Sequence, residues 1–148
     1  MVEVGQKAPS FELKDENGNV VGSESFRGKK ILLAFFPLAF SPVCTDEMKC
    51  FHSDLEKFQE KGVAILGISV DSHWSNAAFR KSVGSSIPLF SDFSREASKK
   101  FGILRQEGFS ERAYFLIDEG GVIRFKHVMD TPKQKLDDDA LLREVGAL

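Results

Sequence analysis

The sequence predicts one α/β domain over residues 1–148, with a mixed central sheet, helices on both faces and an N-terminal β-hairpin. Three observations indicate this class: two apolar runs typical of buried strands, a helical apolar stripe between them, and a hairpin turn near each end of the chain. The 148 residues are the size of a single domain and suffice for a sizeable core.

The first half of the chain predicts a hairpin followed by a strand–helix–strand unit. Residues 11–21 alternate in polarity around an Asn-Gly turn, which is typical of a hairpin. Residues 31–36 are apolar throughout, so both faces of this strand must be covered. A second apolar run at 63–70 then implies a parallel pair with a right-handed crossover. The helix between the strands is predicted over 42–60 from an apolar stripe formed by Met48, Phe51, Leu55 and Phe58.

The second half predicts shorter elements. Asp71 or Ser72 is suited to cap a helix over 76–83. We expect a short edge strand at 87–90, because Pro88 has no N–H to give to a ladder. The remaining predictions are a helix capped by Ser94 and running to about Phe101, an antiparallel hairpin of 113–117 and 122–128, and a closing helix over 137–148. Together these elements form a thioredoxin-like arrangement.

Composition excludes several classes of function. The net charge of −2 argues against a protein that binds nucleic acid through bulk electrostatics. No apolar run approaches the roughly 20 residues of a membrane span, and the first residues lack a signal-peptide pattern, so we expect a cytoplasmic protein. The chain has only two cysteines, Cys44 and Cys50, which makes them the first place to look for chemistry.

Cys44 occupies a position suited to a reactive thiol. It follows the strand predicted at 31–36 and falls in the first turn of the next helix, at the carboxyl edge of the sheet where α/β proteins bind ligands. The free amides and the dipole of a helix N-terminus stabilise a thiolate, which is the nucleophilic form of cysteine. Position alone leaves a second interpretation open, a buried structural cysteine.

The residues around Cys44 resemble the active-site loop of the peroxiredoxins. That family has Pro, three residues, Thr or Ser, two residues and Cys, and here Pro37, Ser41 and Cys44 match in order and spacing. The family's arginine precedes an apolar run that ends in aspartate, and Arg112 begins such a run. Residues 5–11 and 68–72 also agree, so the resemblance covers nearly the whole chain. It is closest to the one-cysteine alkyl hydroperoxide reductase E type, near the bacterioferritin-comigratory branch.

This resemblance implies a thiol-dependent peroxidase that reduces hydrogen peroxide and organic hydroperoxides through a sulfenic acid on Cys44. Arg112 is then expected to lower the thiol pKa and to orient the peroxide. Ser41 and the backbone amide of Val43 are expected to donate to peroxide oxygens, and Pro37 to shape the loop. For Arg112 taken alone, a surface ion pair is the other interpretation.

Two further residues carry open alternatives. Glu47 lies one helical turn beyond Cys44, where it either holds Arg112 by a bidentate pair or is a solvated first-turn acid. Cys50 either resolves the oxidised Cys44 or plays no part in the reaction. On an intact helix six residues amount to about 240° of rotation and about 9 Å of rise, so resolution requires local unwinding.

The resemblance also implies the partners. We expect a hydroperoxide substrate, an external thiol reductant (thioredoxin, glutaredoxin or a low-molecular-weight thiol), a homodimer, and no cofactor. The set Cys44, Cys50 and His52 fits none of the usual zinc spacings, so we expect no metal. Two other functions remain: a thiol-based peroxide sensor, and a thiol–disulfide oxidoreductase. The latter normally needs Cys-x-x-Cys, and position 47 is Glu47 instead.

Overall fold

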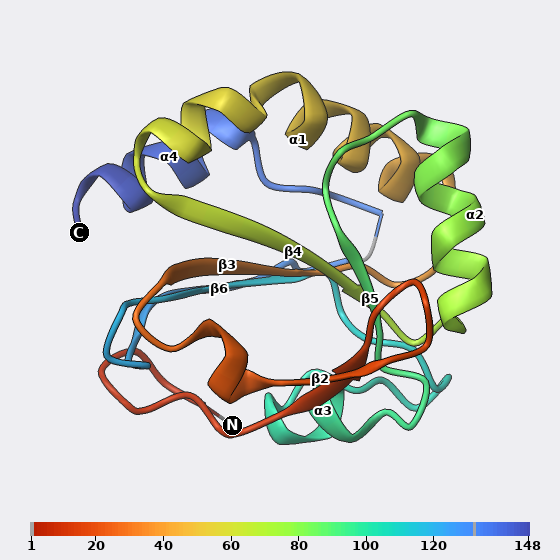
Figure 1. The fold of residues 1–148 in the computed structure, drawn as a ribbon, viewed down its shortest axis with the longest axis horizontal. Coiled ribbons are helices and arrows are strands. Elements are labelled where there is room, and N and C mark those ends of the chain that lie inside the picture. The colour runs from red at the N-terminus through yellow and green to blue at the C-terminus, as the bar shows by residue number, and fades with distance from the viewer. Residues whose placement is uncertain (1, 132) are drawn as a thin grey trace.

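Seven strands form one mixed sheet in the computed structural model, which describes residues 2–131 and 133–148. The strands lie in the order β2-β1-β5-β4-β3-β6-β7 (Figure 1). Their bounds are β1 Glu12–Lys14, β2 Val20–Gly22, β3 Lys30–Phe35, β4 Val63–Ser69, β5 Leu89–Ser91, β6 Ala113–Ile117 and β7 Ile123–Val128. The helices are η1 Ser23–Phe26 (a 3-10 turn), α1 Pro42–Glu60, α2 His73–Val83, α3 Glu96–Lys100 and α4 Asp138–Gly146.

The pairing of the strands confirms the predicted core of the sheet. β3 and β4 run parallel with Ile31 opposite Ala64, and α1 makes the crossover between them. β6 lies antiparallel on the other side of β3, so the start of β6 meets the end of β3 at the pair Phe35–Ala113. The two predicted hairpins are present as β1–β2 and β6–β7. This register decides which side chains meet at the carboxyl edge of the sheet.

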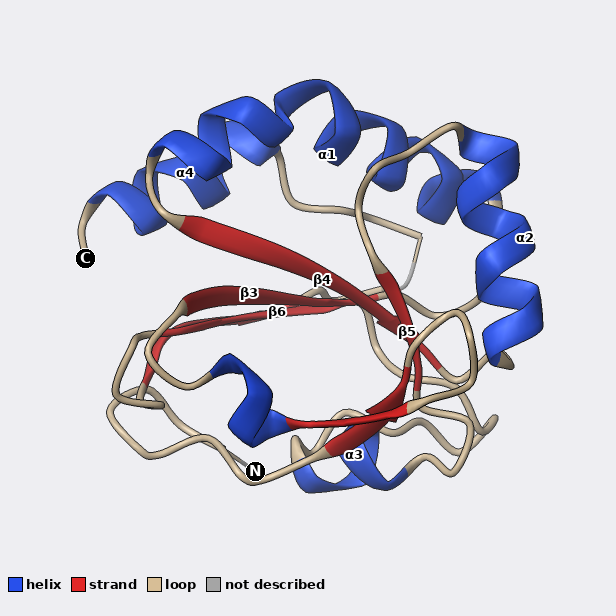
Figure 2. Ribbon diagram, in the orientation of Figure 1, coloured by secondary structure: helices blue, strands red, loops and turns tan. Residues whose placement is uncertain are grey.

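Helices cover both faces of the sheet, as predicted (Figure 2). α1, α2 and α4 pack on one face, with Phe51 and Phe58 from α1, Phe79 from α2 and Leu141 from α4 in a single buried cluster. α3 and η1 pack on the other face, over a second buried cluster that includes Phe35, Phe101 and Phe115. The predicted span of α1 matches the observed helix at both ends.

The prediction of an edge strand at 87–90 is wrong. β5 begins after Pro88 and lies inside the sheet, between β4 and β1. Because the proline precedes the strand, its missing N–H removes no ladder bond. Its carbonyl instead accepts from the Gly67 amide at 3.1 Å.

Two helix starts also differ from the prediction. α2 begins at His73 rather than at residue 76, because Ser72 is the cap and accepts from the Ser75 amide. α3 begins at Glu96, later than a cap at Ser94 predicts. The Ser94 hydroxyl, the predicted cap, accepts from the Glu96 amide at 3.4 Å, and the carboxylate of Asp92 accepts from the Ala97 and Ser98 amides.

Candidate active site

Cys44 lies in the first turn of α1, just beyond the carboxyl end of β3. Ser41 is the N-cap of this helix, and its hydroxyl oxygen accepts from the Cys44 amide at 3.4 Å. Pro42 follows at the first helical position, where a missing N–H costs nothing. The Cys44 side chain has no exposed surface. The sulfur is therefore held in a dry environment at a helix N-terminus, where anions are stabilised.

Arg112 reaches Cys44 from the residue immediately before β6. Because β6 runs antiparallel to β3, this residue arrives at the edge of the sheet where α1 begins. Its Nη2 donates to Sγ of Cys44 at 2.9 Å, and its Nη1 donates to Oε1 of Glu47 at 2.7 Å. Arg112 and Glu47 are each 1% exposed, so a surface ion pair is not the explanation for Arg112.

Glu47 pairs with Arg112, which is one of the two predicted alternatives, but the pair is not bidentate. Oε1 accepts a hydrogen bond from the guanidinium of Arg112, whereas Oε2 accepts from the hydroxyl of Tyr114. The alternative of a solvated first-turn acid is excluded by its burial.

Tyr114 is a site residue that the sequence prediction missed. It is fully buried, donates to Glu47 and accepts from the Leu136 amide at 3.2 Å. A signal for it exists, since it is the only tyrosine in a chain with 14 phenylalanines. It also follows Arg112 by two positions along a strand, which places both side chains on one face.

Burial disfavours the charged forms of Glu47 and Arg112, and the interactions between these groups oppose that effect. Burial raises the pKa of Glu47, while the charge of Arg112 and the hydrogen bonds from Tyr114 and Arg112 pull it back. Burial acts against the charged form of Arg112, but Glu47 and Cys44 more than compensate and its pKa is raised. Burial and the carboxylate of Glu47 raise the pKa of Tyr114. Arg112 thus stays a cation and Tyr114 stays a hydrogen-bond donor.

The loop between β3 and α1 is anchored from β4. Pro37 is buried, and the Ala39 amide donates to Oδ2 of Asp71 at 2.8 Å. The Ser69 hydroxyl donates to the same oxygen, which fixes the carboxylate. The amide of Val43, in the first turn of α1, has no acceptor within the helix. The loop that leads to Cys44 is therefore held by Asp71, an aspartate whose role the sequence did not indicate.

Cys50 is not brought to Cys44. Both belong to the unbroken helix α1, where six residues correspond to about 240° and about 9 Å, beyond the roughly 7 Å that a disulfide allows between Cα atoms. Burial raises the pKa of the Cys50 thiol, which faces Lys135. Among the described residues, no group of three or more His, Cys, Asp or Glu is placed to hold a metal ion.

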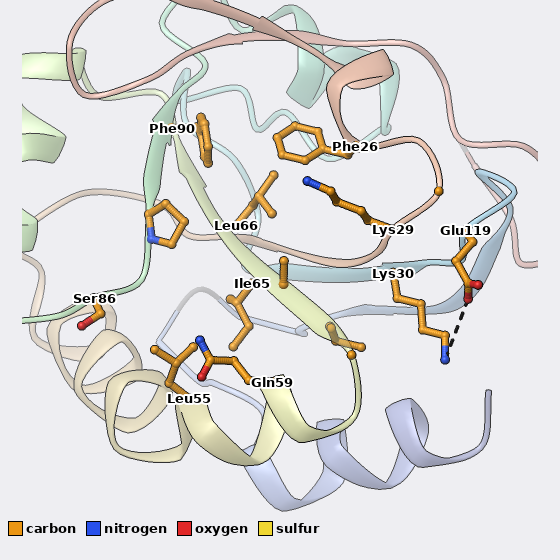
Figure 3. A pocket seen from close by; sticks show the side chains of 15 residues that line it. Phe26, Lys29, Lys30, Leu55, Gln59, Ile65, Leu66, Ser86, Phe90 and Glu119 are labelled. Carbon is orange, nitrogen blue, oxygen red and sulfur yellow. Dashed lines mark ion pairs between the residues drawn. The ribbon is translucent and has the colours of Figure 1, made fainter.

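A cavity of about 670 Å³ lies away from Cys44. It is at the amino ends of β3 and β4, the opposite end of the strands from the reactive thiol. Figure 3 shows Leu66 directed toward Phe26 and Phe90, and Lys30 paired with Glu119 at its rim. Neither Cys44 nor Arg112 lines it.

Comparison with known proteins decides the family. The model of the AhpC/TSA family matches residues 4–126. The chain belongs to the AhpC/TSA family. Among its AhpC/TSA relatives, alkyl hydroperoxide reductase E of Mycobacterium tuberculosis is 35% identical over 95% of this chain and 97% of the relative. Peroxiredoxin-2 of Mus musculus is 35% identical over 94% and 76%.

Solved structures of the AhpC/TSA family agree. The reduced 2-Cys peroxiredoxin of Plasmodium vivax superposes with a TM-score of 0.85 at 32% identity, covering 97% of this chain and 94% of that one. Peroxidoxin BcpB of Mycobacterium tuberculosis has a TM-score of 0.89 at 24% identity, over 100% and 99% of the two chains, and shares the fold. This AhpC/TSA chain is a thiol-dependent peroxidase with a thioredoxin-like fold. No helix within 2–131 and 133–148 combines the length and apolarity that a membrane span requires.

Proposed function

We propose that Cys44 is the thiol that reacts with hydroperoxide. Its thiolate attacks one peroxide oxygen, the O–O bond breaks, and the departing oxygen takes a proton to leave as water or an alcohol. Cys44 is left as a sulfenic acid. The observation that carries this proposal is the 2.9 Å contact between Nη2 of Arg112 and Sγ, made where both side chains are buried.

The neighbouring groups would stabilise charge as it moves across the two oxygens. Arg112 supplies a permanent cation and several donors in a site with little water, where such interactions are strong. Ser41 uses one lone pair as a helix cap and keeps its proton to donate to peroxide. The Val43 amide adds a second donor, and Pro37 holds the loop over the sulfur and excludes water.

Regeneration would come from outside the chain. An external thiol attacks the sulfenic acid, releases water and forms a mixed disulfide with Cys44. A second external thiol then attacks this mixed disulfide, which frees Cys44 and leaves the two external thiols joined as a disulfide. Thioredoxin, glutaredoxin or a low-molecular-weight thiol supplies these electrons. The separation of Cys50 from Cys44 on α1 supports an external reductant. Because both cysteines are free thiols, we place the protein in the cytoplasm, where thiols stay reduced.

Exposed apolar side chains follow three parallel strands at the edge that carries Cys44. Leu38 and Phe40 come after β3, Trp74 after β4 and Phe93 after β5, and each is at least 42% exposed. Apolar groups beside the loop support admission of organic hydroperoxides as well as hydrogen peroxide. A patch of this kind also supports a homodimer formed through this edge.

Stopped-flow oxidation tests the assignment of Cys44. We expect the reduced chain to react with hydrogen peroxide far faster than free cysteine, and Cys44→Ser to abolish the reaction. Cys50→Ser is the matched control and should react like the wild type. Peroxide consumption that survives Cys44→Ser would contradict the proposal. A peroxide sensor would react with hydrogen peroxide once but would not turn over when thioredoxin, glutaredoxin or a small thiol is supplied. Sedimentation of the reduced chain tests the proposed homodimer.

A further inference from the structure

Tyr114 joins three separate parts of the chain at one buried oxygen. Its own strand is β6, its hydroxyl donates to Glu47 on α1, and the same oxygen accepts from the Leu136 amide, which precedes α4. An amide can only donate, so the Leu136 contact leaves the hydroxyl proton of Tyr114 directed at the carboxylate. The direction of this hydrogen bond is therefore fixed by the surrounding backbone.

We propose that Tyr114 is a positioning residue of the peroxidase, which acts through Glu47 and Arg112 to aim the guanidinium at the sulfur of Cys44. The inference rests on the proposed role of Cys44 and adds a residue whose hydroxyl bonds to Glu47 and to the Leu136 amide. The chain of contacts is Tyr114 hydroxyl to Oε2 of Glu47, Oε1 of Glu47 to Nη1 of Arg112, and Nη2 of Arg112 to Sγ.

Burial makes each link of this chain necessary. Glu47 is 1% exposed, so water cannot replace a lost partner at its second oxygen. Without the Tyr114 hydroxyl the carboxylate loses a hydrogen bond that favours its charged form, so it takes up a proton more readily. Protonation weakens the bond from Nη1 of Arg112 to Glu47 and shifts Nη2 relative to the sulfur. A misplacement of this kind lowers the rate without removing the cation.

A double-mutant cycle separates this role from simple structural support. Tyr114→Phe removes one hydroxyl and keeps the ring, and we expect the rate of Cys44 oxidation by hydrogen peroxide to fall about tenfold. In a Glu47→Gln background the same substitution should change the rate less than about twofold, because the residue through which Tyr114 acts is already altered. An equal loss in both backgrounds would mean that Tyr114 acts independently of Glu47, and would overturn the proposal.

The pH dependence gives a second readout. Loss of the Tyr114 donor raises the pKa of Glu47 further, so Glu47 takes up a proton more readily in Tyr114→Phe as the pH falls. The ratio of wild-type to Tyr114→Phe rates should therefore grow as the pH falls, and stay constant in the Glu47→Gln background. Leu116→Val, a substitution two residues along the same face of β6, is the control for loss of packing and should leave the rate unchanged. A pH-independent ratio contradicts the mechanism.

The single tyrosine offers a measurement that needs no disruptive substitution. Fluorinated tyrosine fed to the expressing cells labels Tyr114 alone, and its fluorine NMR signal should shift when one equivalent of hydrogen peroxide oxidises Cys44. The shift should vanish in Cys44→Ser, and a signal that ignores oxidation of the wild type would contradict the coupling. Peroxide consumption unaffected by Cys44→Ser would defeat the assignment of Cys44 and this proposal with it. A fast wild-type rate that Tyr114→Phe leaves unchanged would defeat the role of Tyr114 alone.

Discussion

Arg112 donates to the sulfur of Cys44 at 2.9 Å, although the two residues are 68 positions apart in the chain. The antiparallel register of β3 and β6 creates this contact, since it brings the start of β6 to the edge where α1 begins. The same guanidinium is held by Glu47 through its other nitrogen. One planar group therefore carries two directional bonds at fixed separation, which an ammonium group cannot reproduce.

Arg112→Lys is expected to lower the rate of Cys44 oxidation by at least about 100-fold, because lysine keeps the charge but cannot contact Glu47 and sulfur together. Stopped-flow mixing of the reduced protein with hydrogen peroxide measures this rate. Arg124→Lys is the matched control: Arg124 pairs with Asp118 on the surface of β7 and should tolerate the change. A lysine variant that reacted within threefold of the wild type would show that charge alone suffices.

Ser41 combines two roles that a pair of substitutions separates. Ser41→Ala removes the cap of α1 and should lower the free energy of unfolding by about 1 kcal/mol. It also removes the proposed donor to peroxide, so the rate should fall about tenfold, and Ser41→Thr should restore both properties.

Ser72→Ala provides the control for the Ser41 experiment. Ser72 caps α2 in the same manner, accepting from the Ser75 amide at 3.2 Å. We expect a similar loss of stability in urea unfolding but an unchanged oxidation rate. If Ser72→Ala slowed the reaction as much as Ser41→Ala, the rate effect would come from stability, and the donor role of Ser41 would be wrong.

The site residues close to Cys44 in the sequence could be predicted. Those that come from β6 and the residue before it could be predicted only in part. Pro37, Ser41 and Arg112 stand in a recognisable order, and the structure places Ser41 and Arg112 against Cys44. Tyr114 was missed because a tyrosine in an apolar strand is usual for a core, and only the register shows that its hydroxyl faces Glu47.

The errors in the fold have the same origin. Pro88 indicated an edge strand, but the position of β5 inside the sheet depends on its pairing with β1, a contact between residues far apart in the chain. At the start of α3 the predicted Ser94 accepts from the Glu96 amide, and the carboxylate of Asp92 accepts from the next two amides. Local propensity cannot report the pairing of strands far apart in the chain, and the position of β5 is where the prediction failed.

Cys50 should not form a disulfide with Cys44 while α1 remains intact. We expect peroxide-treated protein without reductant to hold a sulfenic acid at Cys44, which dimedone traps, and to show no disulfide by mass spectrometry of its peptides. Cys50→Ser should trap to the same extent. A peptide pair joined through both cysteines would contradict this prediction and show that the first turns of α1 unwind after oxidation.

Asp138 makes stability depend on pH because it is buried and lies beside Asp54. Burial, and then the hydrogen bond with Asp54, raise the pKa of Asp138 from 3.8 to about 7, and its Oδ2 accepts no hydrogen bond from a described residue. The folded state therefore binds more protons than the unfolded chain between these values, and the free energy of unfolding falls as the pH rises through this window. Above about pH 7 the folded protein carries the full cost of a buried charge.

Asp138→Asn is the final prediction. The amide stays neutral at every pH and still donates to Asp54, so the variant should match the wild type near pH 4 and exceed its stability at pH 8 by on the order of 2 kcal/mol. Urea unfolding across this range measures the difference. Asp139→Asn, a neighbouring substitution at an exposed position, should leave the pH dependence unchanged. A constant difference between Asp138→Asn and the wild type from pH 4 to pH 8 would show that Asp138 does not titrate in this window.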